Sequence, residues 1–141
     1  MTFSSGQAAT ATLLDLVDDS TVVVGQSYLG TMGQLADLEA RRRLRSVTVD
    51  VSDTDAVIAA LDDEDVALLW VESPTNPEML IADLPALIEA AHARDIRVVV
   101  DNTLATPILQ RPLELGADIV LHSVTKYLAG HSDVNLGAGG A

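Results

Sequence analysis

The stretch at residues 118–133 reads Asp-Ile-Val-Leu-His-Ser-Val-Thr-Lys-Tyr-Leu-Ala-Gly-His-Ser-Asp and contains the only lysine of the chain, Lys126. A short apolar run at 119–121 precedes this lysine and is typical of a buried strand. Lys126 therefore follows the carboxyl end of a strand, which is where open α/β sheets bind ligands. We expect its amine to be desolvated, and a neutral amine is the nucleophile that forms Schiff bases with carbonyl compounds. From spacing alone, a structural or surface lysine fits equally well.

Short apolar runs alternate with amphipathic segments along the whole chain, and this pattern predicts βαβ units that wind a mostly parallel sheet. Strands are expected at residues 21–25, 46–51, 66–71, 97–100 and 118–121. Helices are expected at residues 6–17, 32–44, 54–61 and 84–94, with a shorter one at 111–115. Residues suited to helix ends support these bounds: Ser5, Ser52 or Asp53, and Asp83 at starts, and Gly116 after an end. The prediction is one α/β domain over residues 1–141.

The composition excludes several classes of partner and site. The formal net charge is -13, so nucleic acid and anionic membranes are disfavoured as partners. No cysteine is present, which rules out a disulfide framework and a thiolate metal site and fits a reducing cytosol. No apolar run reaches membrane-spanning length, and the first residues do not resemble a secretory signal. We expect a cytoplasmic protein without a metal site.

Polar residues follow each expected strand: Tyr28, then residues 72–77, 101–103 and 122–126. Strand-to-helix turns favour polar residues whatever the function, but this rule does not predict a carboxylate, an amide, a tyrosine and the only lysine together. Asp101 ends a run of valines, so its carboxylate should be partly buried and in need of a cationic partner, such as a protonated ring nitrogen. These residues are expected to meet at one edge of the sheet.

A phosphate site is indicated at the start of the first helix. Residues 4–7 read Ser-Ser-Gly-Gln, and a helix start with small residues and free amides attracts phosphate. Ser123 and Thr125, just before Lys126, offer hydroxyl donors to the same anion. An ordinary helix cap with two turn hydroxyls is the alternative for these residues.

Five motifs, in order, resemble the Cys/Met-metabolism family of pyridoxal-phosphate enzymes, which includes cystathionine γ-synthase, cystathionine γ-lyase, cystathionine β-lyase and methionine γ-lyase. They are Phe-Ser-Ser-Gly-Gln-Ala-Ala at 3–9, Tyr-Leu-Gly-Thr at 28–31, Val-Glu-Ser-Pro-Thr-Asn-Pro at 71–77, Val-Asp-Asn-Thr-Leu-Ala-Thr-Pro at 100–107, and His-Ser-Val-Thr-Lys-Tyr with Gly-His-Ser-Asp at 122–133. The resemblance covers nearly the whole chain. It implies the three-layer α/β large domain of fold-type I pyridoxal-phosphate transferases and pyridoxal 5'-phosphate as cofactor.

The resemblance also implies roles for single residues. Lys126 resembles the lysine that forms the Schiff base with the cofactor, Asp101 the partner of the ring nitrogen, and Tyr28 the tyrosine that stacks on the ring and assists proton transfer. Together these three are the expected catalytic residues. The expected cofactor-binding set adds Asn76 near the ring hydroxyl, Thr103, and the phosphate-binding residues Gly6, Gln7, Ser123 and Thr125. Gln7 stands where methionine is usual and Leu104 where an aromatic residue is common.

The resemblance covers only the middle of full-length members, which carry an N-terminal segment and a C-terminal domain with an arginine for the substrate carboxylate. The chain begins inside the first strand of that fold and stops near Gly137, where the sheet would gain its antiparallel strand. We therefore expect a partial cofactor-binding domain that is truncated at both ends. Its arginines at 41–43 and 45 cluster at a helix end, as a solvated group.

By resemblance, the expected function is elimination or replacement at the β or γ carbon of a sulfur amino acid such as cystathionine, methionine, cysteine or a homoserine derivative, in a homo-oligomer. A remnant without catalytic activity, which binds the cofactor or full-length subunits, is the alternative. A phosphoacceptor receiver domain lacks support because residues 3–6 offer no acidic pair. A dinucleotide site would rest only on the glycines near 137–140, which precede no helix.

Overall fold

The computed structural model describes residues 1–141 as a seven-stranded sheet with helices on both faces. The strands are β1 (Thr2–Phe3), β2 (Ser20–Gly25), β3 (Leu44–Val49), β4 (Val66–Glu72), β5 (Arg97–Asp101), β6 (Ile119–Ser123) and β7 (Gly137–Gly140). The helices are α1 (Gly6–Leu14), α2 (Leu29–Ala40), α3 (Thr54–Ala60), α4 (Leu84–His92), α5 (Thr106–Leu109) and the 3-10 helix η1 (Pro112–Leu115). The strand order is β1-β7-β6-β5-β4-β2-β3. The last five strands in this order, from β6 to β3, run parallel to one another.

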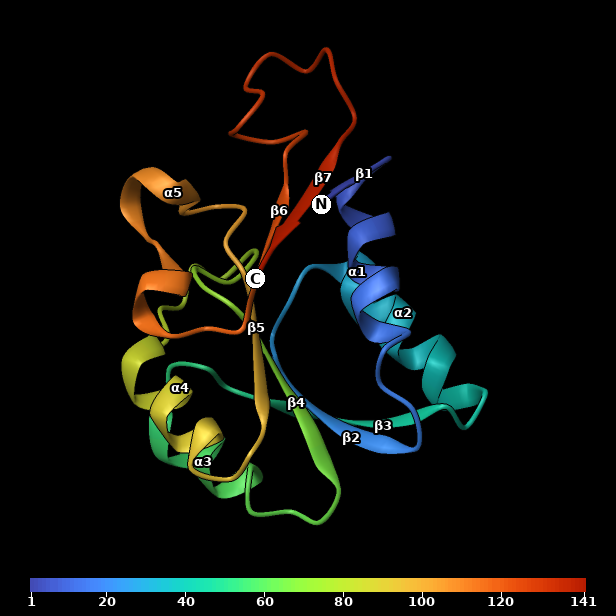
Figure 1. The fold of residues 1–141 in the computed structure, drawn as a ribbon, viewed down its shortest axis with the longest axis vertical. Helices are drawn as coiled ribbons and strands as arrows, with labels where there is room; N and C mark the ends of the chain where they lie inside the picture. The colour runs from blue at the N-terminus through green and yellow to red at the C-terminus, as the bar shows by residue number, and fades with distance from the viewer.

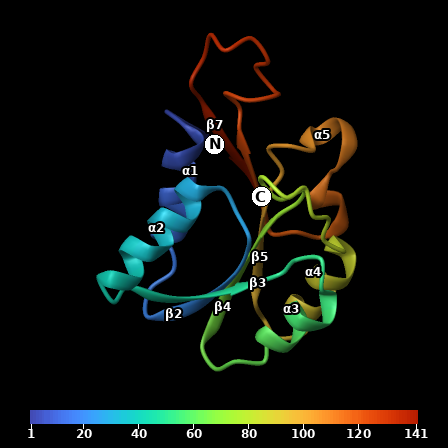
Figure 2. The ribbon, with the colours of Figure 1, turned by 180° about the vertical axis from the view of Figure 1, so that it is seen from behind.

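The three layers are visible in Figures 1 and 2, with α1 and α2 on one face of the sheet and α3 and α4 on the other. Each face has its own apolar core. Trp70 is fully buried beneath α1 and α2, with Leu14 and Leu35 packed in the same cluster. Leu87 and Val98 belong to the second cluster, under α3 and α4. The alternation of side chains along each strand feeds both cores, so the mostly parallel α/β fold is confirmed.

Helix caps fix where three of the helices begin. Ser5 accepts a hydrogen bond from the Ala8 amide at 3.0 Å, and Asp53 caps α3 in the same way through the Ala56 amide. Asp83 caps α4. Gly116 follows η1 in the left-handed conformation, at φ 102°. Because each cap satisfies an amide that the helix leaves free, these starts follow from the sequence.

Several bounds differ from the sequence prediction. The second helix does not run to residue 44: it begins at Leu29 and ends at Ala40, and residue 44 opens β3 instead. Arg42 adopts the left-handed conformation at φ 56°, and the amides of Arg42 and Arg43 bond back to the carbonyls of Glu39 and Leu38. This pair of bonds closes the helix with a Schellman motif and reverses the chain. As a result, β3 spans Leu44–Val49 and lies two residues earlier than the strand predicted at 46–51.

Other differences lie in the short elements. The first helix ends at Leu14 rather than at residue 17, and the segment predicted as a helix at 111–115 is a 3-10 helix. A four-residue helix, α5, was not predicted. The expectation that the chain stops before an antiparallel strand is wrong, because β7 forms at Gly137–Gly140 and pairs antiparallel with both β1 and β6. A Cβ at Gly137 would lie 2.2 Å from the Ser5 carbonyl oxygen, so glycine allows β7 to approach the start of α1.

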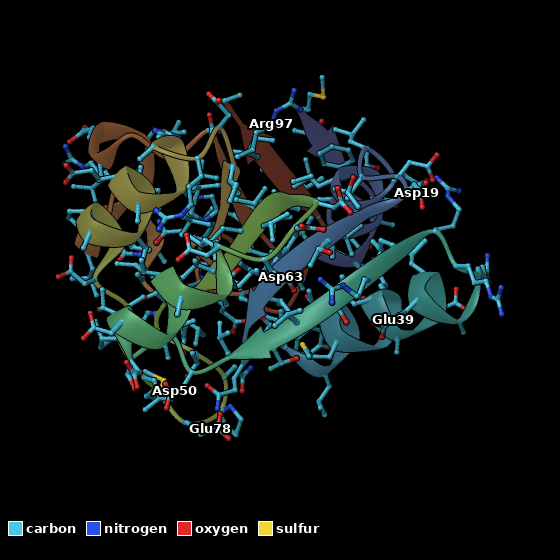
Figure 3. All side chains as sticks on the ribbon, turned by 90° about the horizontal axis from the view of Figure 1, so that it is seen from below. Asp19, Glu39, Asp50, Asp63, Glu78 and Arg97 are labelled. Atoms are coloured by element: carbon cyan, nitrogen blue, oxygen red, sulfur yellow. The ribbon has the colours of Figure 1, made fainter.

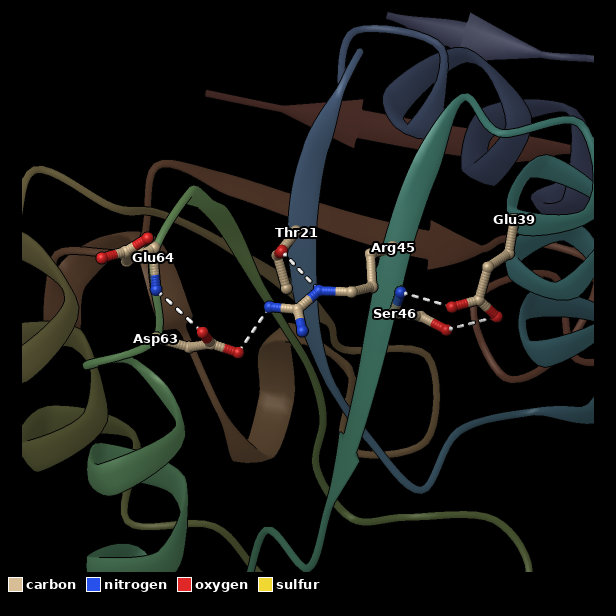
Figure 4. Close-up of polar contacts among 6 residues, drawn as sticks. All are labelled: Thr21, Glu39, Arg45, Ser46, Asp63 and Glu64. Carbon is tan, nitrogen blue, oxygen red and sulfur yellow. Dashed lines mark hydrogen bonds and ion pairs between the residues drawn. The ribbon is translucent and has the colours of Figure 1, made fainter.

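Polar contacts hold the edge strand β3, as Figure 4 shows. Arg45 donates from Nε to Thr21 Oγ1 at 3.1 Å and forms an ion pair with Asp63. On the other side, Glu39 accepts from the Ser46 amide at 3.0 Å. Figure 3 shows further charged side chains, including Asp19, Asp50 and Arg97, around the outside of the ribbon. None of the helices combines the length and the hydrophobicity that a membrane span requires.

Candidate functional site

One cavity of about 890 Å³ lies at the carboxyl ends of the central strands. All nine residues predicted to bind the cofactor line it: Gly6, Gln7, Tyr28, Asn76, Asp101, Thr103, Ser123, Thr125 and Lys126. They come from the start of α1, the start of α2, the loop after β4, the ends of β5 and β6, and the loops that follow β5 and β6. The expectation that these residues meet at one edge of the sheet is confirmed in this respect.

Lys126 lies in the turn after β6 and is the only cation among the residues that line the cavity. Its amide donates to the Ser123 carbonyl at 3.0 Å, so the turn follows directly from the strand end. The side chain is exposed to solvent, however, and the expected desolvation of its amine is wrong for this structure. The cavity is open on the side of Lys126, where exposed residues such as Tyr127 form the rim.

Asp101 ends β5 and is only 8% exposed. Its Oδ1 accepts two hydrogen bonds from Thr103, one from the amide at 3.0 Å and one from the hydroxyl. Burial raises the pKa of Asp101, and the bonds from Thr103 oppose that change. Oδ2 makes no hydrogen bond within the chain, so a cationic donor in the cavity has an acceptor available.

The predicted phosphate end is formed by the start of α1 and the end of β6. The amides of Gly6 and Gln7 belong to the first turn of α1 and therefore have no partner within the helix. The Ser5 side chain does not bond them either, because it caps the Ala8 amide. A Cβ on Gly6 would lie 2.8 Å from Ser123 Cβ and 3.1 Å from Ser123 Cα. Only glycine therefore lets the helix start lie this close to β6, with the Ser123 hydroxyl beside free amides.

Thr125 fits its predicted role less well than Ser123. Its hydroxyl accepts from the Leu136 amide at 2.9 Å and points its proton toward Asn135 Oδ1 and the Leu136 carbonyl. These contacts tie the turn after β6 to the segment that enters β7. In this structure the hydroxyl proton of Thr125 is directed at its own chain rather than at an anion.

The side chain of Gln7 is held by Gln34 of α2. Gln34 Nε2 donates to the Gln7 carbonyl at 3.1 Å and to Gln7 Oε1 at 2.7 Å. Because a main-chain carbonyl can only accept, this contact fixes which way both amides point. The Nε2 group of Gln7 therefore faces Gly30, where a Cβ would lie 2.7 Å from it and 2.6 Å from Tyr28 Cε1. Gly30 leaves room for both side chains.

Glu72 lines the cavity too; it belongs to the stretch 72–77 expected at this edge of the sheet, but the sequence assigned it no role in the site. It ends β4, is 4% exposed, and lies directly opposite Asp101 in the strand pairing. Its Oε2 accepts a hydrogen bond from the Tyr28 amide at 2.7 Å. Burial, with a further contribution from Asp101, raises the pKa of Glu72 to about 7, although the bond from Tyr28 opposes the change. An apolar run that ends in glutamate was the available signal, as for Asp101.

The remaining cavity residues form its outer wall. Asn76 is exposed in the loop after β4, and Leu104, where an aromatic residue is common, also lines the cavity. Tyr28, at the start of α2, is 46% exposed. His122 precedes Ser123 but does not line the cavity, and burial lowers its pKa.

The cavity fits pyridoxal 5'-phosphate on three chemical counts. Asp101 offers a buried, under-bonded carboxylate to a protonated ring nitrogen. The start of α1, opened by Gly6, offers free amides to a phosphate. Lys126 offers a primary amine to an aldehyde at the mouth of the same cavity. No other group of residues in the structure combines these three features.

Comparison with known proteins agrees with this chemistry. Cystathionine β-lyase from Coxiella burnetii is 47% identical over 135 residues, which are 94% of this chain and 35% of that protein. Cystathionine γ-synthase from Mycobacterium bovis is 46% identical over 139 residues, which are 96% of this chain and 36% of that protein. The chain thus spans about a third of the length of these curated relatives.

Solved structures show the same fold. The apo form of CalE6, a methionine γ-lyase from Micromonospora echinospora, matches with a TM-score of 0.93 at 49% identity, over 99% of this chain and 38% of that one. Cystathionine γ-synthase from Xanthomonas oryzae pv. oryzae, in complex with aminoacrylate and cysteine, matches with a TM-score of 0.95 at 38% identity, over 100% of this chain and 37% of that one. Residues 1–139 match the Cys/Met metabolism PLP-dependent enzyme family, and the chain belongs to that family.

Proposed function

We propose that this chain is the cofactor-binding part of a pyridoxal-phosphate enzyme of sulfur amino-acid metabolism, which carries out elimination or replacement at the β or γ carbon of an amino acid. The observation that supports the proposal most is the meeting of nine residues from five separate motifs in one cavity, with the only lysine of the chain at its mouth. When bound, the cofactor supplies an aldehyde that condenses with amines and a protonated ring that accepts electrons.

The residues of the chain divide the work. The amides of Gly6 and Gln7 and the Ser123 hydroxyl bind the phosphate at the helix start. Asp101, kept in place by Thr103, would hold the proton on the ring nitrogen, and burial of its carboxylate would strengthen that ionic contact.

Three residues act on the exposed side of the ring. Lys126 would hold the aldehyde group through Nζ, and the same amine would move the proton at the substrate Cα. Tyr28, at the start of α2, would cover the ring and pass a proton to the leaving group. Asn76 hydrogen-bonds the ring hydroxyl from the loop after β4.

We further propose that the 141-residue chain on its own binds the cofactor without turnover. The residues lining the cavity include no arginine, and Lys126, which is already committed to the aldehyde, is their only cation. The substrate carboxylate therefore has no fixed cationic partner within these residues, and substrate positioning is a large part of the rate enhancement in such enzymes.

The test is cofactor binding by the purified chain, followed by absorbance and by quenching of Trp70, the single tryptophan. We expect saturable binding by the wild type. In Lys126→Ala, we expect the absorbance change that reports reaction of the aldehyde with the lysine to be absent. Arg97→Ala is the matched control, since it removes an exposed cation at the opposite end of β5. Equal binding by the wild type and Lys126→Ala, with identical spectra, would contradict the proposal.

A further inference from the structure

Glu72 joins two parts of the cavity that are far apart in the sequence. Its carboxylate, at the end of β4, accepts the amide of Tyr28 at the start of α2, across 44 residues of chain. This is the only hydrogen bond of the Glu72 side chain. A glutamate with 4% exposure is costly unless it is bonded, so its presence here calls for a reason.

Tyr28 depends on this contact for its position. It occupies the N-cap position of α2, and its own side chain makes no capping bond. The two residues before it do not anchor the segment, because the buried Gln26 Oε1 and Ser27 Oγ have no hydrogen-bond partner. The side chain of Tyr28 is 46% exposed, so packing alone holds it loosely. The Tyr28 amide bonded to Glu72 is therefore the main polar attachment of this segment to the sheet.

We propose that Glu72 is a positioning residue that holds Tyr28 over the cavity through the Tyr28 amide, and that a cationic ligand ring at Asp101 strengthens this hold by favouring the ionised form of Glu72. The part concerning the ligand rests on the proposed function; the contact between Glu72 and Tyr28 does not.

The charge of Glu72 sets the strength of the contact. A carboxylate accepts an amide hydrogen bond more strongly than a neutral carboxyl group does. Since burial and Asp101 raise the pKa of Glu72 to about 7, the group is mostly protonated below that pH and ionised above it. The titratable groups that share the cavity with Glu72 are Asp101 on β5, the Tyr28 and Tyr127 phenols and the Lys126 amine.

A ligand changes this balance through charge. In the free chain, ionised Glu72 lies beside Asp101 without a buried cation between them. A protonated ring nitrogen bound at Asp101 offsets the repulsion between the two carboxylates, so the pKa of Glu72 falls. The bond to Tyr28 then strengthens at neutral pH, and the tyrosine is fixed over the ligand once the ligand is bound.

The first experiment uses the chain without cofactor. The amide resonance of Tyr28 is followed by proton–nitrogen NMR between pH 5.5 and 8.5 in the wild type, Glu72→Gln and Glu72→Leu. Glu78→Gln is the matched control, because Glu78 is exposed in the loop after β4 and makes no hydrogen bond. We expect a step in the wild type and in the control with a midpoint near 7.

Glu72→Gln keeps an oxygen for the Tyr28 amide but cannot ionise, so we expect slow amide exchange without a pH step. Glu72→Leu has no acceptor, and we expect rapid exchange at Tyr28. A role for Glu72 in packing alone would leave the pH step unexplained. A step of unchanged size in Glu72→Gln, or no step in the wild type, would overturn the proposal.

The second experiment adds pyridoxal 5'-phosphate and repeats the pH series, with binding followed through Trp70. We expect the midpoint at Tyr28 to fall by about one pH unit, which corresponds to binding about tenfold tighter to the ionised form. Glu72→Gln should lose this pH dependence. An unchanged midpoint with cofactor bound would refute the ligand-linked part. If neither the wild type nor any of the variants binds the cofactor, the proposed function and the ligand-linked part are both refuted. The first experiment still decides the contact between Glu72 and Tyr28.

Discussion

Replacing Gly6 by alanine tests the geometry of the phosphate end. The new Cβ would lie 2.8 Å from Ser123 Cβ, which is 0.6 Å inside the 3.4 Å at which ordinary contact begins. Rotation of the Ser123 side chain cannot relieve the overlap, because Ser123 Cα is itself 3.1 Å away. The start of α1 must therefore move away from β6. Overpacking of this kind costs about 1–3 kcal/mol.

Gly33→Ala is the matched control for this substitution. Gly33 lies within α2, and a Cβ there meets nothing within 4 Å. Gly33→Ala makes the same chemical change in a helix without any overlap, so it serves as the reference for the overlap at Ser123. We expect urea unfolding to show Gly6→Ala about 1–3 kcal/mol less stable than Gly33→Ala.

Cofactor affinity should change in parallel with stability. Moving the amides of Gly6 and Gln7 weakens at least one hydrogen bond to a charged group, which is worth about 1.5–3 kcal/mol, so we expect binding at least about tenfold weaker. Gly33→Ala should bind as the wild type does. If Gly6→Ala unfolds at the same urea concentration as Gly33→Ala and binds cofactor equally well, the close approach of α1 to β6 is wrong.

Three further outcomes are expected. Asp101→Asn should weaken cofactor retention by about tenfold or more while circular dichroism stays unchanged, because a neutral amide does not hold the ring proton; retention equal to wild type would remove the role of Asp101. Desolvation acts to raise the pKa of Asp118, but bonds from the Val98 amide (2.7 Å) and His92 (3.0 Å) lower it overall. The stabilisation that Asp118 provides is therefore present above its unfolded pKa and is lost as pH falls through its lowered folded pKa. Asp118→Asn should make the free energy of unfolding depend less steeply on pH in acid, and an unchanged dependence would contradict this. The 141-residue chain should release no keto acid from cystathionine or methionine, and Lys126-dependent release would contradict this.

The position of the site could be predicted because parallel strands bring their carboxyl ends together. Asp101 and Lys126 each follow an apolar run, and a buried strand that ends in a charged residue places that residue at the sheet edge. The nine residues predicted to bind the cofactor could be placed at this edge from the order of strands and helices and from the five motifs alone. Helix starts were predictable for a similar reason, since a cap such as Ser5 acts on an amide three residues away.

The features that sequence could not predict depend on distant contacts. The role of Glu72 requires the Tyr28 amide, which lies 44 residues earlier in the chain. The exposure of Lys126 depends on how the loop before β7 lies around the cavity. The end of α2 rests on a left-handed arginine, Arg42, which is an unusual residue for that conformation. The short strand β7 has little strand propensity and forms because Gly137 fits against Ser5.

The most direct test of the proposed cofactor site is chemical labelling of its amine. The chain is incubated with pyridoxal 5'-phosphate, reduced with borohydride, digested and mapped. The competing amine is the amino group of Met1, which is exposed and donates to the Gly139 carbonyl at 2.7 Å, while Lys126 lines the cavity. We expect stoichiometric label on Lys126, with Asp101→Asn reducing it. Label on Met1 with Lys126 unmodified would contradict the assignment.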